Sequence, residues 1–141
     1  IRINPRKQDP LQVIREATSE RGVDVAFEAV GHGVEIENVP DPVVGCVRAI
    51  RGAGTVCVLG LSDHAVSLVM KEIIWKEAKI VASRVSHGEF SEAIEAMQNK
   101  QINPEALITS EMHGSNTQLA FETLAEDPDG QLKIILQFSE R

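Results

Sequence analysis

The apolar positions of the chain cluster in two short runs that lie about one helix length apart. Residues 23–29 and 55–59 form these runs, and a glycine follows each of them closely, at Gly31 and Gly60. Continuous apolar runs, in contrast to alternating ones, are typical of parallel strands that helices cover on both faces. The pattern therefore predicts an α/β fold built on an open parallel sheet.

The residues that follow the two runs are expected to mark a ligand-binding edge. In open parallel sheets, ligands bind outside the carboxyl ends of the strands. The six residues at these two places are Val30, Gly31, His32, Leu59, Gly60 and Leu61. Because parallel strands end on the same side of a sheet, both places belong to one predicted edge.

Periodicity and flanking residues predict the other elements. Asp9 is an N-cap residue, Pro10 suits the first helical position and Gln12 is placed to close a capping box, so a helix begins there. Gly22 is expected to end this helix. Further helices are expected at residues 43–51, 70–76, 89–99 and 117–125, and further strands at 1–4, 65–69, 79–82, 107–110 and 132–138.

Two glycine pairs lie near strand ends. Gly31 and Gly33 follow a strand, but Ile36 occupies the third glycine position of a dinucleotide-binding turn, so this segment is not the pyrophosphate turn. Gly52 and Gly54 lead from a helix into a strand, where no helix N-terminus is available to hold a phosphate. The second pair is therefore predicted to be a simple turn.

Composition and charge narrow the class of function. The 141 residues are 43% hydrophobic, which suffices for an ordinary core, and their net charge is −7. Because nucleic-acid binding needs clustered Lys and Arg, a nucleic-acid partner is not expected. The sequence has no signal peptide and no apolar stretch of transmembrane length, so a cytoplasmic protein without a membrane partner is expected. Cys46 and Cys57 lack partners at metal-ligand spacing and are expected to be buried thiols.

A few other side chains are candidates for chemistry. His32 lies at the predicted edge, where a cofactor contact and an exposed loop position are both open. Glu28 ends a strand there, and a carboxylate that accepts backbone N–H groups is favoured over a general base. Lys133 is a candidate for a phosphate contact or a solvated lysine. The residues expected in the core include Met70, Trp75 and Met97.

Six short motifs, taken in order, make the chain resemble the medium-chain dehydrogenase/reductase family. They are NPR at residues 4–6, GVDVAFEAVG at 22–31, RGAGTVCVLG at 51–60, WKE at 75–77, KIVAS at 79–83 and LKIIL at 132–136. Each motif is weakly specific alone, but their common order covers almost the whole chain. The resemblance is closest to the zinc-containing alcohol, polyol and threonine dehydrogenases.

This resemblance implies that the chain is a carboxyl-terminal fragment of a larger enzyme. Residues 1–83 would be the second half of an NAD(P)-binding Rossmann domain with a doubly wound parallel sheet. Residues 84–141 would be an α/β segment that packs on a catalytic domain outside this sequence. The zinc ligands and the glycine-rich turn would also lie outside it. No catalytic residue or metal ligand is therefore expected within the chain, and the fragment alone is expected to be inactive.

The resemblance also assigns eight cofactor-binding positions to this sequence. They are Val30, Gly31 and His32 beside the adenosine half of NAD or NADP, Leu59, Gly60, Leu61 and Val81 around the nicotinamide, and Lys133 near the pyrophosphate. His32 stands where some relatives use an arginine.

The implied function of the intact parent is that of a zinc-containing, NAD(P)-dependent oxidoreductase. Zinc would polarise a small-molecule alcohol or polyol, and hydride would pass to the nicotinamide. Two alternatives stay open: a zinc-independent quinone or enoyl reductase of the same family, and an inactive module for cofactor binding or dimerisation. The edge segment 65–69, from Ala65 to Val69, is expected to pair with its own copy and to form a homodimer or tetramer.

Overall fold

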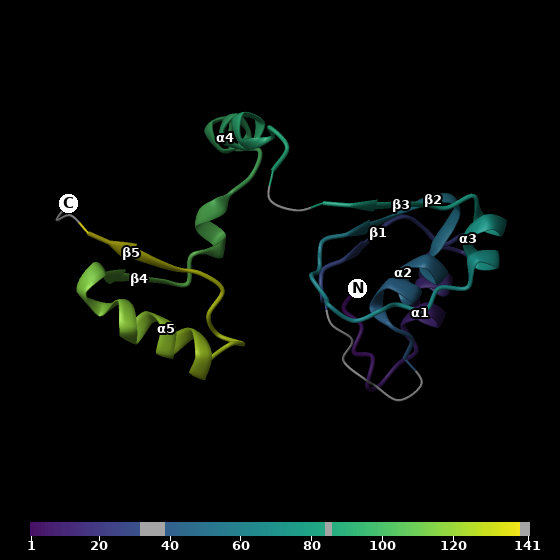
Figure 1. The fold of residues 1–141 in the computed structure, drawn as a ribbon, viewed down its shortest axis with the longest axis horizontal. Helices are drawn as coiled ribbons and strands as arrows, with labels where there is room; N and C mark the ends of the chain where they lie inside the picture. Colours follow the sequence, from purple (N-terminus) through teal and green to yellow (C-terminus); the bar gives the residue numbers. More distant parts are fainter. Residues whose placement is uncertain (32–38, 84–85, 139–141) are drawn as a thin grey trace. The chain divides into compact units, whose positions relative to one another are not determined.

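Parallel strands joined by helices recur along the chain, as the α/β prediction requires. The computed structural model describes residues 1–31, 39–83 and 86–138 (Figure 1). The chain forms two compact units, Ile1–Val85 and Ser86–Arg141. Both contain parallel strand pairs, so the predicted fold class is confirmed.

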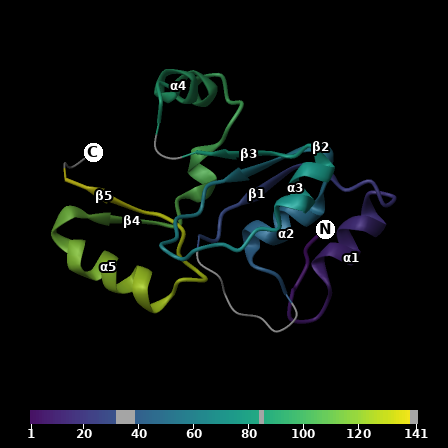
Figure 2. The same cartoon turned by 45° about the vertical axis from the view of Figure 1, so that its right-hand side comes forward.

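The first unit contains a three-stranded parallel sheet in the order β1-β2-β3. Its strands are β1 (Val23–Glu28), β2 (Ile50–Val58) and β3 (Lys79–Ala82), and its helices are α1 (Pro10–Ala17), α2 (Pro42–Ala49) and α3 (Met70–Lys76). A helix joins each strand to the next, because parallel neighbours need a crossover connection. The three helices gather on one side of the sheet (Figures 1 and 2).

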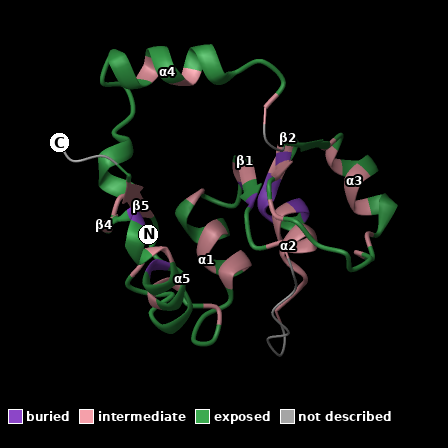
Figure 3. Ribbon diagram, turned by 60° about the vertical axis from the view of Figure 1, so that its left-hand side comes forward, coloured by how far each residue is buried: buried purple, intermediate pink, exposed green. Residues whose placement is uncertain are grey.

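The core of the first unit lies between α2 and the sheet. Val47 of α2 and Val56 of β2 are each 0% exposed, and Ile50, the first residue of β2, is 2% exposed. In Figure 3, the buried residues of the first unit gather around α2 and β2. Full burial of each such side chain contributes roughly 1.5–3 kcal/mol, so this small cluster is what fixes α2 on the sheet.

The opposite face of the sheet is exposed. Phe27 of β1 lies beside Cys57 of β2, which lies beside Val81 of β3, so the three share one row across the sheet. Phe27 is 66% exposed and Val81 is 46% exposed. The expectation that helices cover both faces is therefore wrong for the described part of this unit, because its helices follow crossovers that all return on the same side.

The strand β2 begins five residues earlier than predicted and contains an irregularity. Val23 pairs with Ile50, but Val25 pairs with Thr55, so an advance of two residues along β1 matches an advance of five residues along β2. Ala53 lies among the extra residues of β2 and has a φ of 56°, in the left-handed region. The prediction of a turn at residues 52–54 is therefore wrong, because these residues form a bulge inside β2.

The start of α1 is built largely as the sequence predicts. The Asp9 side chain accepts a hydrogen bond from the Leu11 N–H at 2.9 Å, and Pro10 occupies the first helical position. The predicted capping box is wrong. The Gln12 amide instead donates to Glu16 at 2.9 Å, because an (i, i+4) partner on the same helix face is within reach.

The end of α1 lies before the predicted stop at Gly22. The helix ends at Ala17, and the Thr18 hydroxyl donates to the Ile14 carbonyl at 2.7 Å. Gly22 has a different task, since a Cβ there would lie 2.7 Å from the Ala49 carbonyl oxygen. It is a glycine because the backbones of β1 and α2 meet at this point.

Two predicted strands are absent from the described residues. At residues 1–4, the Asn4 side chain accepts from the Arg6 N–H at 3.0 Å and its carbonyl accepts from the Lys7 N–H at 2.9 Å, which makes a turn. An Asn-Pro pair favours turn initiation. Residues 65–69 also form no strand, because they pair with no neighbouring strand in the described part of the chain.

The second unit is a smaller parallel pair with one crossover helix. Its elements are α4 (Phe90–Gln98), a 3₁₀ helix (Pro104–Leu107), β4 (Ser110–His113), a second 3₁₀ helix (Gly114–Asn116), α5 (Thr117–Glu126) and β5 (Ile134–Gln137). The predicted helices and the last strand are confirmed. The strand expected at 107–110 begins instead at Ser110, because Pro104 starts a 3₁₀ turn with Asn103 as its cap.

Several apolar side chains that were expected in the core are exposed. Met70 is 60% exposed, Trp75 76% and Met97 44%. The core prediction for these three is wrong, because helical periodicity identifies a stripe but not whether the chain covers it. The Lys71 ammonium lies 4.2 Å from the centre of the Trp75 ring. Cys46 and Cys57 lie in α2 and β2, where both are free and half-buried.

None of the helices in the described ranges combines the length and the apolar character that crossing a membrane requires.

Candidate functional site

The segments that follow β1 and β2 contact each other closely through two glycines, Gly31 and Gly60, and we call this contact the crossing. A Cβ on Gly60 would lie 2.2 Å from the Gly31 nitrogen, and a Cβ on Gly31 would lie 2.4 Å from the Leu61 carbonyl oxygen. Gly31 also has a φ of 82°, which L side chains rarely adopt. Only glycine fits at both positions, so the backbone of each loop reaches the other directly.

Glu28 stabilises the crossing by accepting hydrogen bonds from both segments. The residue is 3% exposed, and its Oε1 accepts hydrogen bonds from the N–H groups of Val30 at 2.6 Å and Gly31 at 2.9 Å. Its carbonyl oxygen accepts from Leu59 at 2.7 Å and Gly60 at 3.1 Å. The prediction that Glu28 is a structural carboxylate is confirmed.

The surface of the crossing is apolar. Val30 is 52% exposed, Leu59 43%, Leu61 59% and Val81 46%. Val81 belongs to β3 and pairs with Cys57, two residues before Leu59. Exposed aliphatic side chains over a close-packed backbone can bind a flat ring by contact, and they offer no proton donor or acceptor for catalysis.

A small cavity of about 140 Å³ adjoins the crossing. Glu28, Gly31 and Gly60 line it together with Asp41 and His64. Asp41 is committed to the start of α2, where its side chain accepts from the Val43 N–H at 2.9 Å. The cavity therefore separates the strand ends from the start of α2 and carries two carboxylates on its wall.

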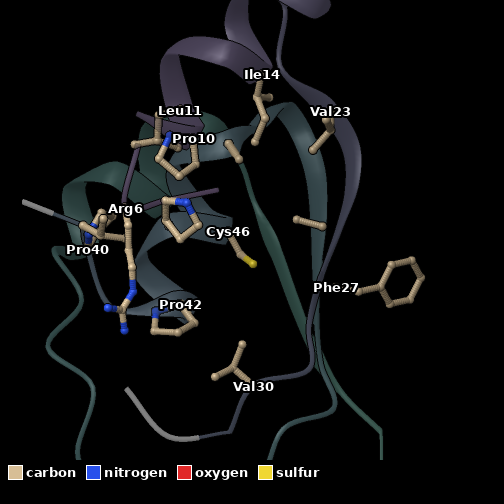
Figure 4. Close-up of a pocket in the computed structure, with 15 residues that line it drawn as sticks. Arg6, Pro10, Leu11, Ile14, Val23, Phe27, Val30, Pro40, Pro42 and Cys46 are labelled. Atoms are coloured by element: carbon tan, nitrogen blue, oxygen red, sulfur yellow. The ribbon is translucent and has the colours of Figure 1, made fainter. Parts of the chain in front are cut away.

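A larger, apolar cavity of about 680 Å³ lies between α1, α2 and β1. Figure 4 shows Leu11, Cys46 and Val30 around it, with the Phe27 ring pointing away. Burial raises the pKa of the Cys46 thiol, and the charges of Glu28 and Asp41 raise it further, so this cysteine is a poor nucleophile at neutral pH. Sequence reasoning missed the cavity, because its lining comes from three elements whose packing no local pattern reveals.

The structure brings most of the predicted cofactor positions to one edge. Val30, Gly31, Leu59, Gly60 and Leu61 meet at the crossing. His32 lies outside the described residues. Lys133 belongs to the second unit, where its carbonyl accepts from the Thr109 N–H at 2.9 Å and its side chain is exposed. The contact of each of the eight positions with a cofactor stays a prediction.

Within residues 1–31, 39–83 and 86–138, no group of three His, Cys, Asp or Glu side chains is arranged to hold a metal ion. The described side chains therefore do not fit a zinc centre by themselves, since structural and catalytic zinc sites need at least three protein ligands.

Comparison with known proteins identifies the family of the chain. Residues 2–99 match the zinc-binding dehydrogenase family, and the chain belongs to that family. An uncharacterised zinc-type alcohol dehydrogenase-like protein of Haemophilus influenzae is 30% identical over 94% of this chain. L-idonate 5-dehydrogenase (NAD(P)(+)) of Escherichia coli is 27% identical over 96% of it. The resemblance seen in the six motifs is thus confirmed.

A solved structure gives the same result for the fold. The crystal structure of L-idonate 5-dehydrogenase from Escherichia coli superposes on 96% of this chain with a TM-score of 0.76 at 26% identity. The chain spans 36% of that structure and 36% of each of the two relatives. The sheet of the first unit therefore matches the Rossmann-type half of a dehydrogenase, and the chain corresponds to about a third of such proteins.

Proposed function

We propose that the chain acts as part of an NAD(P)-dependent oxidoreductase that transfers hydride between an alcohol or polyol and a nicotinamide cofactor. The glycine crossing at Gly31 and Gly60 carries the proposal, since it forms a close-packed, exposed edge at the carboxyl ends of parallel strands. The relatives support the reaction class, because several bear the names of alcohol and polyol dehydrogenases.

The residues at the edge fit one face of a dinucleotide. Glycine keeps the crossing free of side chains, and the exposed aliphatic groups around it suit the flat nicotinamide and adenosine. The cofactor, when bound, accepts or donates the hydride. The groups that would hold it are Val30, Gly31 and His32 at the adenosine half, Leu59, Gly60, Leu61 and Val81 at the nicotinamide, and Lys133 at the pyrophosphate.

The part of these residues in the reaction is binding and orientation. Apolar contacts and backbone groups at the edge hold the nicotinamide ring in one pose and keep water from its face. Because the described side chains do not supply a ligand set, a zinc ion in the intact enzyme would have to be held by residues outside the described ranges.

Titration of NADH and NADPH into the full-length protein tests the proposal. Saturable enhancement of cofactor fluorescence is expected for at least one of them, together with reduction of NAD or NADP in the presence of polyols such as sorbitol. A full-length protein that binds neither dinucleotide would reject the proposed function.

A further inference from the structure

We infer that Glu28 is the positioning residue of the proposed cofactor edge, since this one residue fixes the backbone of both strand ends. The inference rests on the proposed function and assigns a role to a residue that is itself buried, at 3% exposure. Glu28 acts through Val30, Gly31, Leu59 and Gly60, whose backbone forms the edge.

The hydrogen bonds show how one residue controls two loops. The carboxylate binds the Val30 and Gly31 N–H groups that follow β1, while the carbonyl binds the Leu59 and Gly60 N–H groups that follow β2. All four N–H groups are therefore used inside the protein. A phosphate finds none of these donors free, so the edge is suited to apolar contact with rings and not to the pyrophosphate.

The energetics indicate that this arrangement is specific. Glu28 is the buried charged residue of the described chain, and no Lys or Arg among the described residues forms an ion pair with it. A buried carboxylate without a cation depends on its hydrogen bonds for stability. A Cβ on Gly60 would lie 2.6 Å from its Oε2, so the carboxylate lies against the Gly60 backbone and leaves no space for a side chain there. The loop geometry and the carboxylate position therefore determine each other.

Three substitutions of Glu28 in the full-length enzyme separate position from charge. Glu28→Gln keeps the length and one acceptor oxygen, Glu28→Asp keeps the charge but withdraws it by one methylene, and Glu28→Ala removes the acceptor. Val47→Ala is the matched control, since Val47 is 0% exposed and lies in the core, so its truncation destabilises the unit without touching the edge.

The NADH dissociation constant and the emission maximum of bound NADH are the readouts. If Glu28 positions the edge, the dissociation constant rises at least about tenfold in Glu28→Asp and Glu28→Ala, as expected when a charge-assisted hydrogen bond is lost, with an altered emission maximum. Glu28→Gln keeps the dissociation constant within roughly threefold of the wild-type value, since it can still accept a hydrogen bond from a backbone N–H. Val47→Ala lowers the melting temperature and leaves the dissociation constant unchanged.

Amide hydrogen exchange gives a second readout that needs no cofactor. The Val30 and Gly31 amides are expected to be protected in the wild type and in Glu28→Gln, and to lose protection in Glu28→Asp. Unprotected amides in the wild type would overturn the inference. So would unchanged NADH affinity in folded Glu28→Asp, or an equal loss of affinity in Val47→Ala. If Glu28→Ala does not fold, the Asp and Gln variants decide.

The two hypotheses fail in different ways. A wild type that binds NADH, with variants that bind it as tightly as the wild type does, refutes only this inference. A wild type that binds neither dinucleotide refutes the proposed function.

Discussion

A single side chain, Lys76, closes the carboxyl end of α2. Its ammonium donates to the carbonyl oxygens of Val47 at 2.9 Å, Arg48 at 2.8 Å and Ile50 at 2.6 Å. The last carbonyls of a helix lack partners within the helix, and a cation there is favourable. Because Lys76 ends α3, the same contact ties α3 to α2.

Replacement of Lys76 by Met is expected to destabilise the chain. Met keeps most of the apolar stem but leaves the three carbonyls without their donor, so the free energy of unfolding should fall by roughly 1.5–3 kcal/mol. Urea unfolding followed by circular dichroism measures this. Lys71→Met, on the same helix, removes only an exposed contact with Trp75 and should cost less than about 1 kcal/mol. Equal costs for the two variants would show that the carbonyl contacts contribute little.

The glycines illustrate what sequence shows at this scale and what it does not. The sequence identifies Gly31 and Gly60 as the ends of strands, and Glu28 as a structural carboxylate, because each follows or ends an apolar run. Their mutual contact was not predictable, since residues 29 positions apart approach only once α2 has packed on the sheet. The large apolar cavity was missed for the same reason.

Gly60→Ala and Gly52→Ala are expected to behave differently. A Cβ at position 60 meets the Gly31 backbone, whereas a Cβ at position 52 meets nothing within 4 Å. Gly60→Ala should therefore lower the melting temperature by several degrees, as expected for a loss of about 1–3 kcal/mol from overpacking. Gly52→Ala should leave it unchanged or raise it slightly, because it restricts the unfolded chain. Similar melting temperatures for the two variants would contradict the crossing.

At the scale of elements, sequence pattern predicted which segments form helices and strands better than where they end. The positions of β1, β3, α3, α4, α5 and β5 follow from apolar runs and helical spacing. The bulge in β2 could not be inferred, because it depends on pairing with β1 and on the contact between Arg51 and Asp24. Arg51 donates to Asp24 at 2.6 Å and to the Gly52 carbonyl at 2.6 Å, which holds the bulge against β1.

The ion pair at the bulge predicts a pH dependence of stability. The hydrogen bond from Arg51, and then the charge of Arg21, lower the pKa of Asp24 below its ordinary value of 3.8. The unfolded chain therefore binds the proton more readily than the native state, so the ion pair stabilises the fold above pH 3.8 and loses this effect as the pH falls through the native pKa.

Asp24→Asn should reduce the loss of stability at acid pH. The wild type is expected to lose more stability between neutral pH and acid than Asp24→Asn, as measured by the urea midpoint at several pH values. The difference should be small, since the Asp24 side chain is 57% exposed and solvent screens the pair. Asp63→Asn, in an exposed loop of the same unit, is the control and should match the wild type. Parallel curves for wild type and Asp24→Asn would show that the pair does not hold the bulge.

At the scale of the whole molecule, exposed apolar surface is the dominant feature of the first unit. The α3 side chains Met70, Ile74 and Trp75 are 60%, 66% and 76% exposed, and Val69 just before them is 54% exposed. Contiguous apolar surface of this kind is typical of interaction sites. It adjoins the segment 65–69, which we propose as the site of self-association, and which has no partner strand among the described residues.

Val66→Pro is expected to weaken self-association of the full-length protein. If residues 65–69 become a strand only by pairing with the same segment of a second copy, proline at position 66 removes a backbone donor from that pairing. Sedimentation velocity should show a shift from dimer or tetramer toward monomer, with the melting temperature reported alongside. Val66→Ala keeps the backbone donor and removes the same side chain, so it should retain the wild-type assembly. A Val66→Pro variant that sediments as the wild type does would place the interface elsewhere. The exposed apolar face of α3 would then be its first candidate, and Trp75, the single tryptophan of the chain, lies on α3 and would report its burial by fluorescence.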